Sequence, residues 1–301
     1  MTRIIIILNF FGFVFVLNSC KNASTGQQTD KNNPNNSILW EISGNGLEHK
    51  SHLYGTIHIQ DKRVFQYGKT VEDILKNTSI IAVEIELDNI EPMAAIQATM
   101  MKDSTLDQLL SPEEYALLEE KYTEITGVSL ATAQQLKPFF LSANIVQALV
   151  PKDFPVPLDM HFIQYGRKEN KRVVGLETFT EQMNLVDMLS YSEQARMLLE
   201  SLTDTVDIAD MFDKLVSSYL NMETDSLVEL TKDPSIPEKF MEVLLNKRNH
   251  IMAERVEPLL REGSVFCAVG AAHLFGEEGL IDLLEAKGYT LKPVLFSFEN
   301  K

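Results

Sequence analysis

Short apolar runs lie at both ends of the chain, and stretches with apolar residues at helical spacing lie between them. Residues 37–46 and 50–59 are rich in β-forming side chains and meet at a Gly-Asn-Gly turn, which predicts a hairpin. A short helix follows, and the apolar run 79–87 predicts a buried strand. Residues 264–296 predict strand, loop, helix, turn and strand, the same order as near the start.

The middle of the chain carries helix signals. Ser111 and Glu114 form a capping-box pattern, and Gly127 predicts the end of that helix. A helix over 157–166 and a short strand over 171–178 are expected next. Residues 178–262 are then nearly all amphipathic helix, with further start signals at 190–193 and 235–238.

These elements predict an α/β fold. A central mixed sheet is built from two β-α-β units at the chain ends, and a large helical insertion separates them. Parallel strands joined by helices are covered on both faces, and ligands gather outside their carboxyl ends. The residues that follow such strands are therefore the candidates for chemistry.

The N-terminus differs from the rest of the chain. Residues 1–20 have one early basic residue and a short apolar run, then end in Leu-Asn-Ser-Cys, which predicts a lipoprotein signal peptide with lipid on Cys20. An uncleaved N-terminal anchor is the alternative, and both place the body outside the cytoplasm, in a bacterial cell envelope. Residues 21–36 contain almost nothing apolar and predict a disordered tether. The remaining residues, 37–301, form the predicted domain.

Charge and cysteine content narrow the function classes. The chain has 43 acidic and 27 basic side chains, and a net charge of −16 argues against nucleic acid as a partner. Once Cys20 carries lipid, Cys267 is the only remaining thiol, so no intramolecular disulfide is expected. Cys267 lies in an apolar strand pattern and is expected to be a small core residue.

Two distant strands end in Gly-x-x-His. Gly55 precedes His58, and Gly270 precedes His273, each directly after an apolar run. Glycine lets the backbone turn tightly or approach a ligand closely. A single such histidine is usually structural, but the repeated context indicates that both emerge at the ligand-binding edge of the sheet.

Acidic residues accompany these histidines. Glu84 and Glu86 are two apart in the predicted strand 79–87, so they are expected on one face. Burying a carboxylate costs free energy unless it is paired or bound to a cation, so buried glutamates here would indicate a site. An edge strand with one solvent-exposed face would also explain Glu84 and Glu86. Asp159 and Glu177 lie near element ends, where each is either a site residue or a cap. Arg248 lies on a predicted helix and either reaches a carboxylate or is solvated.

Two imidazoles and a carboxylate are a recurrent ligand set for a hydrolytic divalent metal, and a second carboxylate can accept a proton. The sequence contains no H-E-x-x-H, G-x-S-x-G or Walker-type loop, which argues against serine-hydrolase and nucleotide-binding classes. His161 lies two residues beyond Asp159, so on a helix the two side chains diverge and are not expected to be joint ligands.

Several segments together resemble the TraB/GumN family, which includes the Tiki metal-dependent proteases. They are Leu-Tyr-Gly-Thr-Ile-His, Ala-Val-Glu-Ile-Glu-Leu, Leu-Asp-Met-His-Phe, Gly-Leu-Glu-Thr, Arg-Asn-His-Ile-Met and the region around the second Gly-x-x-His. The resemblance covers about residues 37–297 and implies a fold related to erythromycin-esterase and ChaN-like proteins. It implies a metal-dependent peptidase that uses the residues matching His58, His273 and Glu84. The residues that match recurrent polar positions of the family are Asp159, Glu177, Gln182 and Arg248. Glu86 stands at a position where similar sequences often have Asp.

The sequence thus predicts a lipid-anchored metal-dependent hydrolase acting on a peptide or protein. His58 and His273, with Glu84 and Asp159, are the predicted metal ligands, and manganese, cobalt and zinc all remain open. Glu84, Glu86, Glu177 and Arg248 are the predicted catalytic residues. The alternatives are a peptide- or haem-binding protein without turnover, and a metal-free esterase-like hydrolase that uses His58 as a base.

Overall fold

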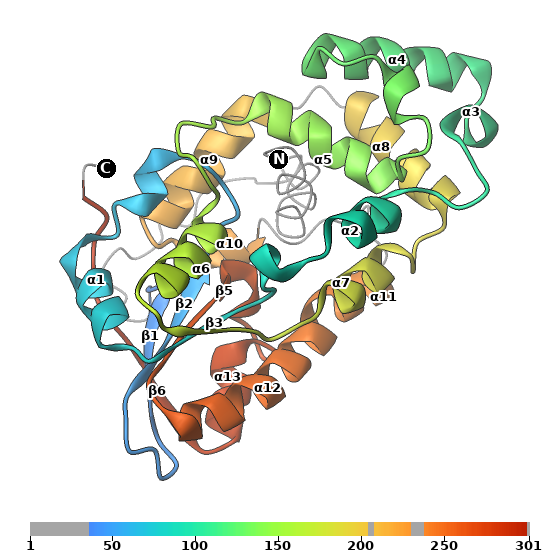
Figure 1. The fold of residues 1–301 in the computed structure, drawn as a ribbon. Coiled ribbons are helices and arrows are strands. Elements are labelled where there is room, and N and C mark those ends of the chain that lie inside the picture. Colours follow the sequence, from blue (N-terminus) through green and yellow to red (C-terminus); the bar gives the residue numbers. More distant parts are fainter. Residues whose placement is uncertain (1–35, 204–207, 230–237, 300–301) are drawn as a thin grey trace.

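The structure, a computed structural model, describes residues 36–203, 208–229 and 238–299 (Figure 1). The signal segment, Cys20 and almost all of the predicted tether lie outside these residues, as does most of the predicted helix start at 235–238. Among the described residues, no helix is long and apolar enough to cross a membrane.

The sheet has six strands in the order β4-β3-β5-β2-β1-β6. Three neighbouring pairs are parallel, namely β4 with β3, β3 with β5, and β5 with β2. Strand β1 pairs antiparallel with both β2 and β6. The strands are β1 (Leu39–Gly44), β2 (Ser51–Thr56), β3 (Ile80–Val83), β4 (Arg172–Gly175), β5 (Val265–Gly270) and β6 (Tyr289–Pro293).

Helices of the first half of the chain join β2 to β3 and then lead away from the sheet and back to β4. They are η4 (Lys62–Phe65), α1 (Gly68–Asn77), η5 (Leu87–Asn89), α2 (Pro92–Thr99), α3 (Leu106–Leu109), α4 (Pro112–Thr126), η6 (Leu130–Ala133), α5 (Pro138–Leu149) and α6 (Leu158–Lys168).

The second half is helical up to β5. Its helices are α7 (Phe179–Val186), α8 (Tyr191–Thr203), α9 (Ile208–Leu220), α10 (Thr224–Glu229), α11 (Glu238–Met241), the π-helical η7 (Glu242–Lys247), α12 (Arg248–Glu262), η8 (Ala271–His273) and α13 (Leu280–Ala286).

The predicted fold class is confirmed. The unit β2-α1-β3 lies at one end of the chain and β5-α13-β6 at the other, and β5 inserts between β2 and β3 in the sheet. The predicted hairpin is also present, since Leu39 of β1 pairs with Tyr54 of β2. Helix α4 has the expected capping box, and Gly127 ends it in the left-handed conformation with φ 69°.

Strands β3 and β5, in the middle of the sheet, are buried on both faces, and their side chains alternate between two cores. On β5, Phe266 packs with α1, α6 and α9, whereas Cys267 packs with α12 and α13. Figure 1 shows these two helical layers on opposite sides of the sheet. Helices α4, α5, α7 and α8 form a third core of their own. Cys267 is 1% exposed, as expected for a core residue, and burial raises the pKa of its thiol to about 12.

Candidate active site

The carboxyl ends of four neighbouring parallel strands meet at one edge of the sheet. Glu84 follows β3 directly, His58 lies two residues after β2, and His273 ends the short turn η8 after β5. Glu177 lies two residues after β4. Residues far apart in the chain therefore lie together because their strands are adjacent and share a direction.

Glu84 is at the centre of this group. Its Oε1 atom lies 3.7 Å from His58 Nε2 and 3.7 Å from His273 Nε2, and it accepts a hydrogen bond of 2.6 Å from the Gly270 amide. Its Oε2 atom accepts from Arg248 at 2.7 Å. Burial opposes a charged Glu84, but Arg248 and the two histidines outweigh it and hold the pKa of Glu84 well below its usual value. Glu84 is therefore a carboxylate.

Each imidazole is held from its Nδ1 side. His58 Nδ1 lies 2.6 Å from Asp159 Oδ2, and Asp159 Oδ1 accepts from the Thr56 hydroxyl at 2.6 Å. His273 Nδ1 lies 2.6 Å from Asn249 Oδ1. Both Nε2 atoms consequently face the Glu84 carboxylate.

The different Nδ1 partners give the two histidines different proton affinities. Burial disfavours a charged His58, but the carboxylates of Asp159 and Glu84 outweigh it and raise the pKa of His58 to about 10. For His273, burial and the nearby Arg248 guanidinium lower the pKa to about 3. His273 is thus neutral in the folded protein at any ordinary pH.

Arg248 joins two acidic residues beneath the histidines. It is 3% exposed, and its guanidinium donates to both oxygens of Glu177 and to Glu84. Glu177 also accepts from Gln182 at 3.2 Å. The π-helical turn η7 ends just before Arg248, and such turns often occur at functional sites. Arg248 therefore reaches inward, one of the two possibilities that its sequence left open.

The glycines of the two Gly-x-x-His segments differ in their surroundings. A Cβ at Gly55 would lie 3.1 Å from the backbone and side chain of Ala271, so this glycine allows β2 to pack against η8. A Cβ at Gly270 would lie 3.1 Å from Glu84 Oε1 and 3.3 Å from His58 Nε2. Gly270 therefore leaves space beside the atoms on which the site converges.

Glu86 has other partners. Strand β3 ends at Val83, so the expectation that Glu84 and Glu86 share one face of a strand is wrong. Glu86 accepts from Arg167 at 2.6 Å and from the Gly175 amide at 3.1 Å. The chain leaves extended geometry after Val83, and the period of two no longer applies.

Other predicted residues are placed as follows. Asp159 lies behind His58, on the side of the ring away from Glu84, with hydrogen bonds to both its oxygens. His161 accepts or donates one hydrogen bond with Tyr67 at 2.9 Å and packs edge-on against Phe65, apart from its neighbour Asp159. The divergence of Asp159 and His161 was expected from helical spacing.

Sequence reasoning missed two polar residues of the site, Thr56 and Asn249. The signal for Asn249 was available: on α12 it shares the buried face with Met252, Ala253 and Val256, and an amide at such a position needs polar partners. Thr56 gave no signal, because a threonine at the end of a strand is common.

The donor atoms of the site are of the kinds that bind a divalent ion. Two imidazole nitrogens and a carboxylate oxygen are suitable ligands, and an ion with tetrahedral bonds of about 2.1 Å separates its ligands by roughly 3.4 Å, close to the 3.7 Å found here. Metal ligation requires both imidazoles to be unprotonated, so binding of an ion would release the proton that the raised pKa holds on His58. With both imidazoles neutral, the carboxylates of Glu84, Asp159 and Glu177 against one guanidinium give a formal charge of −2. Within the described ranges, however, no three His, Cys, Asp or Glu side chains are already arranged to hold a metal ion. The residues suit a divalent cation in donor chemistry and in charge.

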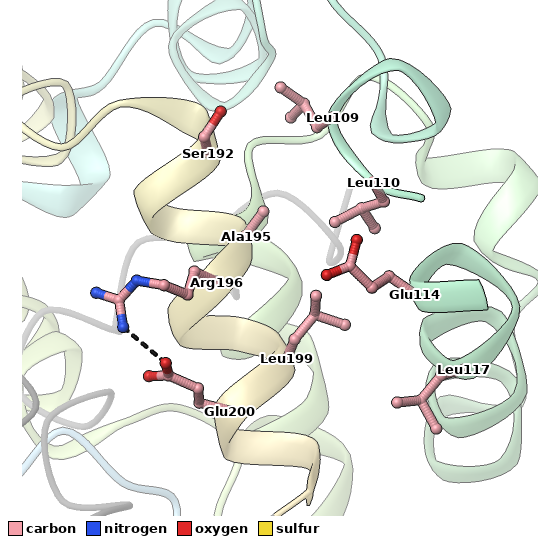
Figure 2. Close-up of a pocket in the computed structure, with 9 residues that line it drawn as sticks. All are labelled: Leu109, Leu110, Glu114, Leu117, Ser192, Ala195, Arg196, Leu199 and Glu200. Carbon is pink, nitrogen blue, oxygen red and sulfur yellow. Dashed lines mark hydrogen bonds and ion pairs between the residues drawn. The ribbon is translucent and has the colours of Figure 1, made fainter. Parts of the chain in front are cut away.

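A separate pocket of about 370 Å³ lies in the helical insertion (Figure 2). Leu109, Leu117 and Leu199 give it an apolar lining, between the α3–α4 turn and α8. Glu114 caps α4, and Arg196 pairs with Glu200 within the lining. None of the lining residues belongs to the strand-end site, so the pocket is distinct from it.

Comparison with known proteins identifies the family of the chain. The model of the TraB/PrgY/gumN family matches residues 38–293. The chain belongs to this family. No solved structure matches the chain significantly.

Relatives in this family are distant in sequence. An uncharacterized protein of Treponema pallidum is 21% identical, over 90% of this chain and 87% of its own length. Metalloprotease TIKI1 of Danio rerio is 24% identical, over 85% of this chain and 63% of its own, so the chain spans less than two thirds of that relative. The uncharacterized protein YbaP of Escherichia coli is 23% identical, over 77% of this chain and 87% of its own.

Proposed function

We propose that this protein is a metal-dependent hydrolase that acts on peptides or proteins. The observation that carries the proposal is the approach of two imidazole Nε2 atoms to one carboxylate oxygen, each at 3.7 Å. Three groups that attract cations face one another in a buried, negatively charged site, and this arrangement is favourable when a cation lies among them. The distant relatives named metalloproteases support the same class.

In this proposal, His58, His273 and Glu84 hold a divalent ion. Manganese, cobalt and zinc all suit this donor set. When bound, such an ion polarises a substrate carbonyl and lowers the pKa of water. Asp159 and Asn249 orient the imidazoles, and Asp159 therefore serves His58 instead of acting as a ligand.

The remaining acidic residues have supporting roles. Arg248 neutralises Glu84 and is itself held by Glu177, which fixes the direction of the Glu84 carboxylate. Glu84 is the carboxylate that faces the Nε2 atoms of both histidines, so it acts either as a ligand of the ion or as the base that accepts a proton from an attacking water. Glu86 is paired with Arg167 and has no direct role in this proposal.

One observation favours a second candidate, a metal-free hydrolase with His58 as base. The contact between His58 and Asp159 resembles the arrangement of a general base and the acid that orients it, and the raised pKa of His58 means that the imidazole must first lose a proton to act as a base. The two candidates differ in their response to chelators, because only the first needs a metal ion.

The test combines metal analysis, thermal unfolding and peptide cleavage on the purified chain. We expect a bound transition metal near one equivalent, loss of cleavage with a chelator and recovery on adding metal back. His58→Ala and His273→Ala should lose both the metal and the added thermal stability that a metal bound only by the folded state provides. His250→Ala, an exposed histidine paired with Glu278, is the matched control and should behave as wild type. Cleavage that survives complete metal removal would favour the metal-free candidate, and unchanged metal content in both histidine variants would exclude the proposed site.

We also propose that the chain is anchored by lipid on Cys20 and acts in the bacterial cell envelope. The pattern of residues 1–20 supports this proposal. An anchored hydrolase outside the cytoplasm would meet peptide or protein substrates there.

A further inference from the structure

The hydrogen bonds around Asn249 determine its orientation. Its Nδ2 atom donates to the backbone carbonyl of Glu278 at 2.7 Å. A carbonyl oxygen only accepts hydrogen bonds, so the amine end of the Asn249 amide must face Glu278. The Oδ1 atom then faces His273 Nδ1, at 2.6 Å.

This orientation fixes the position of a proton on His273. The Asn249 oxygen only accepts, so His273 Nδ1 must carry the hydrogen, and a neutral His273 has an unprotonated Nε2. The opposite tautomer also has a partner at hand, because a proton on Nε2 would point toward Glu84 Oε1, 3.7 Å away. A charged carboxylate is normally the stronger acceptor. Asn249 therefore acts against the tautomer that Glu84 alone would favour.

The support for Asn249 comes from a neighbouring loop. Glu278 lies in the segment between η8 and α13, and its carboxylate contacts His250 at 2.5 Å while its carbonyl accepts from Asn249. Asn249 is 2% exposed, so solvent does not compete for its amide. The loop backbone thus fixes the orientation of the Asn249 amide, and the Asn249 amide fixes that of the His273 ring.

We propose that Asn249 is a positioning residue that locks His273 in the tautomer protonated at Nδ1 and keeps its Nε2 lone pair free toward the centre of the site. Its importance for activity rests on the proposed metal-dependent function, since a metal ligand must present an unprotonated nitrogen. The tautomer itself does not depend on that function.

The test is ¹⁵N NMR of the histidine rings in the full chain. The sequence has six histidines, and His273→Gln identifies the signals of His273 by their loss. In wild type we expect His273 to be protonated at Nδ1. Asn249→Ala should move the proton wholly or partly to Nε2, whereas Asn249→Asp, which keeps an acceptor beside Nδ1, should retain the wild-type tautomer. His250→Ala, which alters only the Glu278 carboxylate contact, is the control and should also retain it.

Zinc binding by the same variants provides the second measurement. Loss of a partner that orients a metal-bound histidine typically weakens metal binding by about 10–100-fold, and this is the loss expected for Asn249→Ala. A His273 protonated at Nε2 in wild type, or an unchanged tautomer in Asn249→Ala, would overturn the proposal. The wild-type spectrum decides the point even where Asn249→Ala does not fold. Absence of zinc binding by wild type would instead count against the proposed function, and the tautomer measurement would still stand.

Discussion

Gly270 shows how one residue without a side chain determines what fits beside reactive groups. Its amide donates to Glu84, and its α-carbon faces both His58 and Glu84. Its φ of −52° is accessible to any residue, so a side chain here is excluded by its neighbours and not by backbone strain. Gly55 occupies the corresponding place in the first Gly-x-x-His segment, but it faces packed apolar atoms.

This difference predicts opposite consequences for two alanine substitutions. Gly270→Ala should abolish metal binding, or reduce the affinity at least about tenfold, because the new methyl group enters the space beside Glu84 and His58. Gly55→Ala should cost about 1–3 kcal/mol of stability through overpacking against Ala271. Metal titration and urea unfolding of both variants check the prediction. Equal effects of the two variants on metal binding would contradict it.

At the scale of elements, the residues of the site lie at the ends of helices and strands. The first turn of α6 presents Asp159, the first turn of α12 presents Arg248 and Asn249, and strand ends present the histidines and Glu84. Helix α7, which follows Glu177, starts with a capping box formed by Thr178 and Glu181. Arg255 of α12 pairs with Glu181 at 2.6 Å, so this ion pair and the Glu177–Arg248 pair both join α12 to the segment around the start of α7.

The α7 cap predicts that wild type and Glu181→Ala differ in stability by an amount that depends on pH. The Arg255 guanidinium, aided by the Thr178 amide, lowers the pKa of Glu181 to about 2, below the value of 4.5 expected in an unfolded chain. A lowered pKa stabilises the fold above pH 4.5, and the contribution is lost as pH falls toward 2. Because Glu181 is partly exposed, Glu181→Ala should cost only about 1 kcal/mol at pH 7.

Urea unfolding of wild type and Glu181→Ala between pH 7 and pH 2.5 measures this difference. Glu119→Ala, which removes an exposed acid on α4 outside the cap, is the control and should change the stability only slightly. A Glu181→Ala difference that grew on acidification would have the wrong sign.

At the scale of the whole molecule, the site depends on both ends of the domain. Strand β5, from the C-terminal part, inserts between β2 and β3, from the N-terminal part, and only this insertion brings His273 to Glu84. The long helical insertion forms its own core beyond the sheet. The chain as a whole is acidic, with a net charge of −16.

Because the body of the protein is acidic, we expect the proposed lipid to provide most of its attachment to the membrane. An acidic body is repelled by anionic lipid, so removing the acyl chain leaves little attraction to the bilayer. Cys20→Ser should therefore leave the protein either uncleaved, with residues 1–20 still attached, or cleaved and in the soluble fraction of the producing bacterium. Cys267→Ser, a buried thiol, should leave the distribution unchanged. Full membrane retention of a processed Cys20→Ser chain would contradict lipid anchoring.

Local features of the sequence determined much of the outcome. The capping box of α4, the helix start at 190–193, the hairpin, the buried strands and the position of each Gly-x-x-His segment follow from local propensity and apolar period, which nearby residues specify. Together with the rule that ligands gather at the carboxyl ends of parallel strands, these features predicted that His58, His273 and Glu84 would meet.

Only the tertiary structure decided how these residues are held. The early end of β3 separates Glu86 from Glu84, the inward reach of Arg248 joins Glu84 to Glu177, and Asn249 and Asp159 select which ring nitrogen of each histidine faces the centre. These arrangements depend on contacts across more than twenty residues of chain and on where each backbone bends. A sequence period describes which side of an element is buried, but the direction of a polar side chain is set by its partners in space.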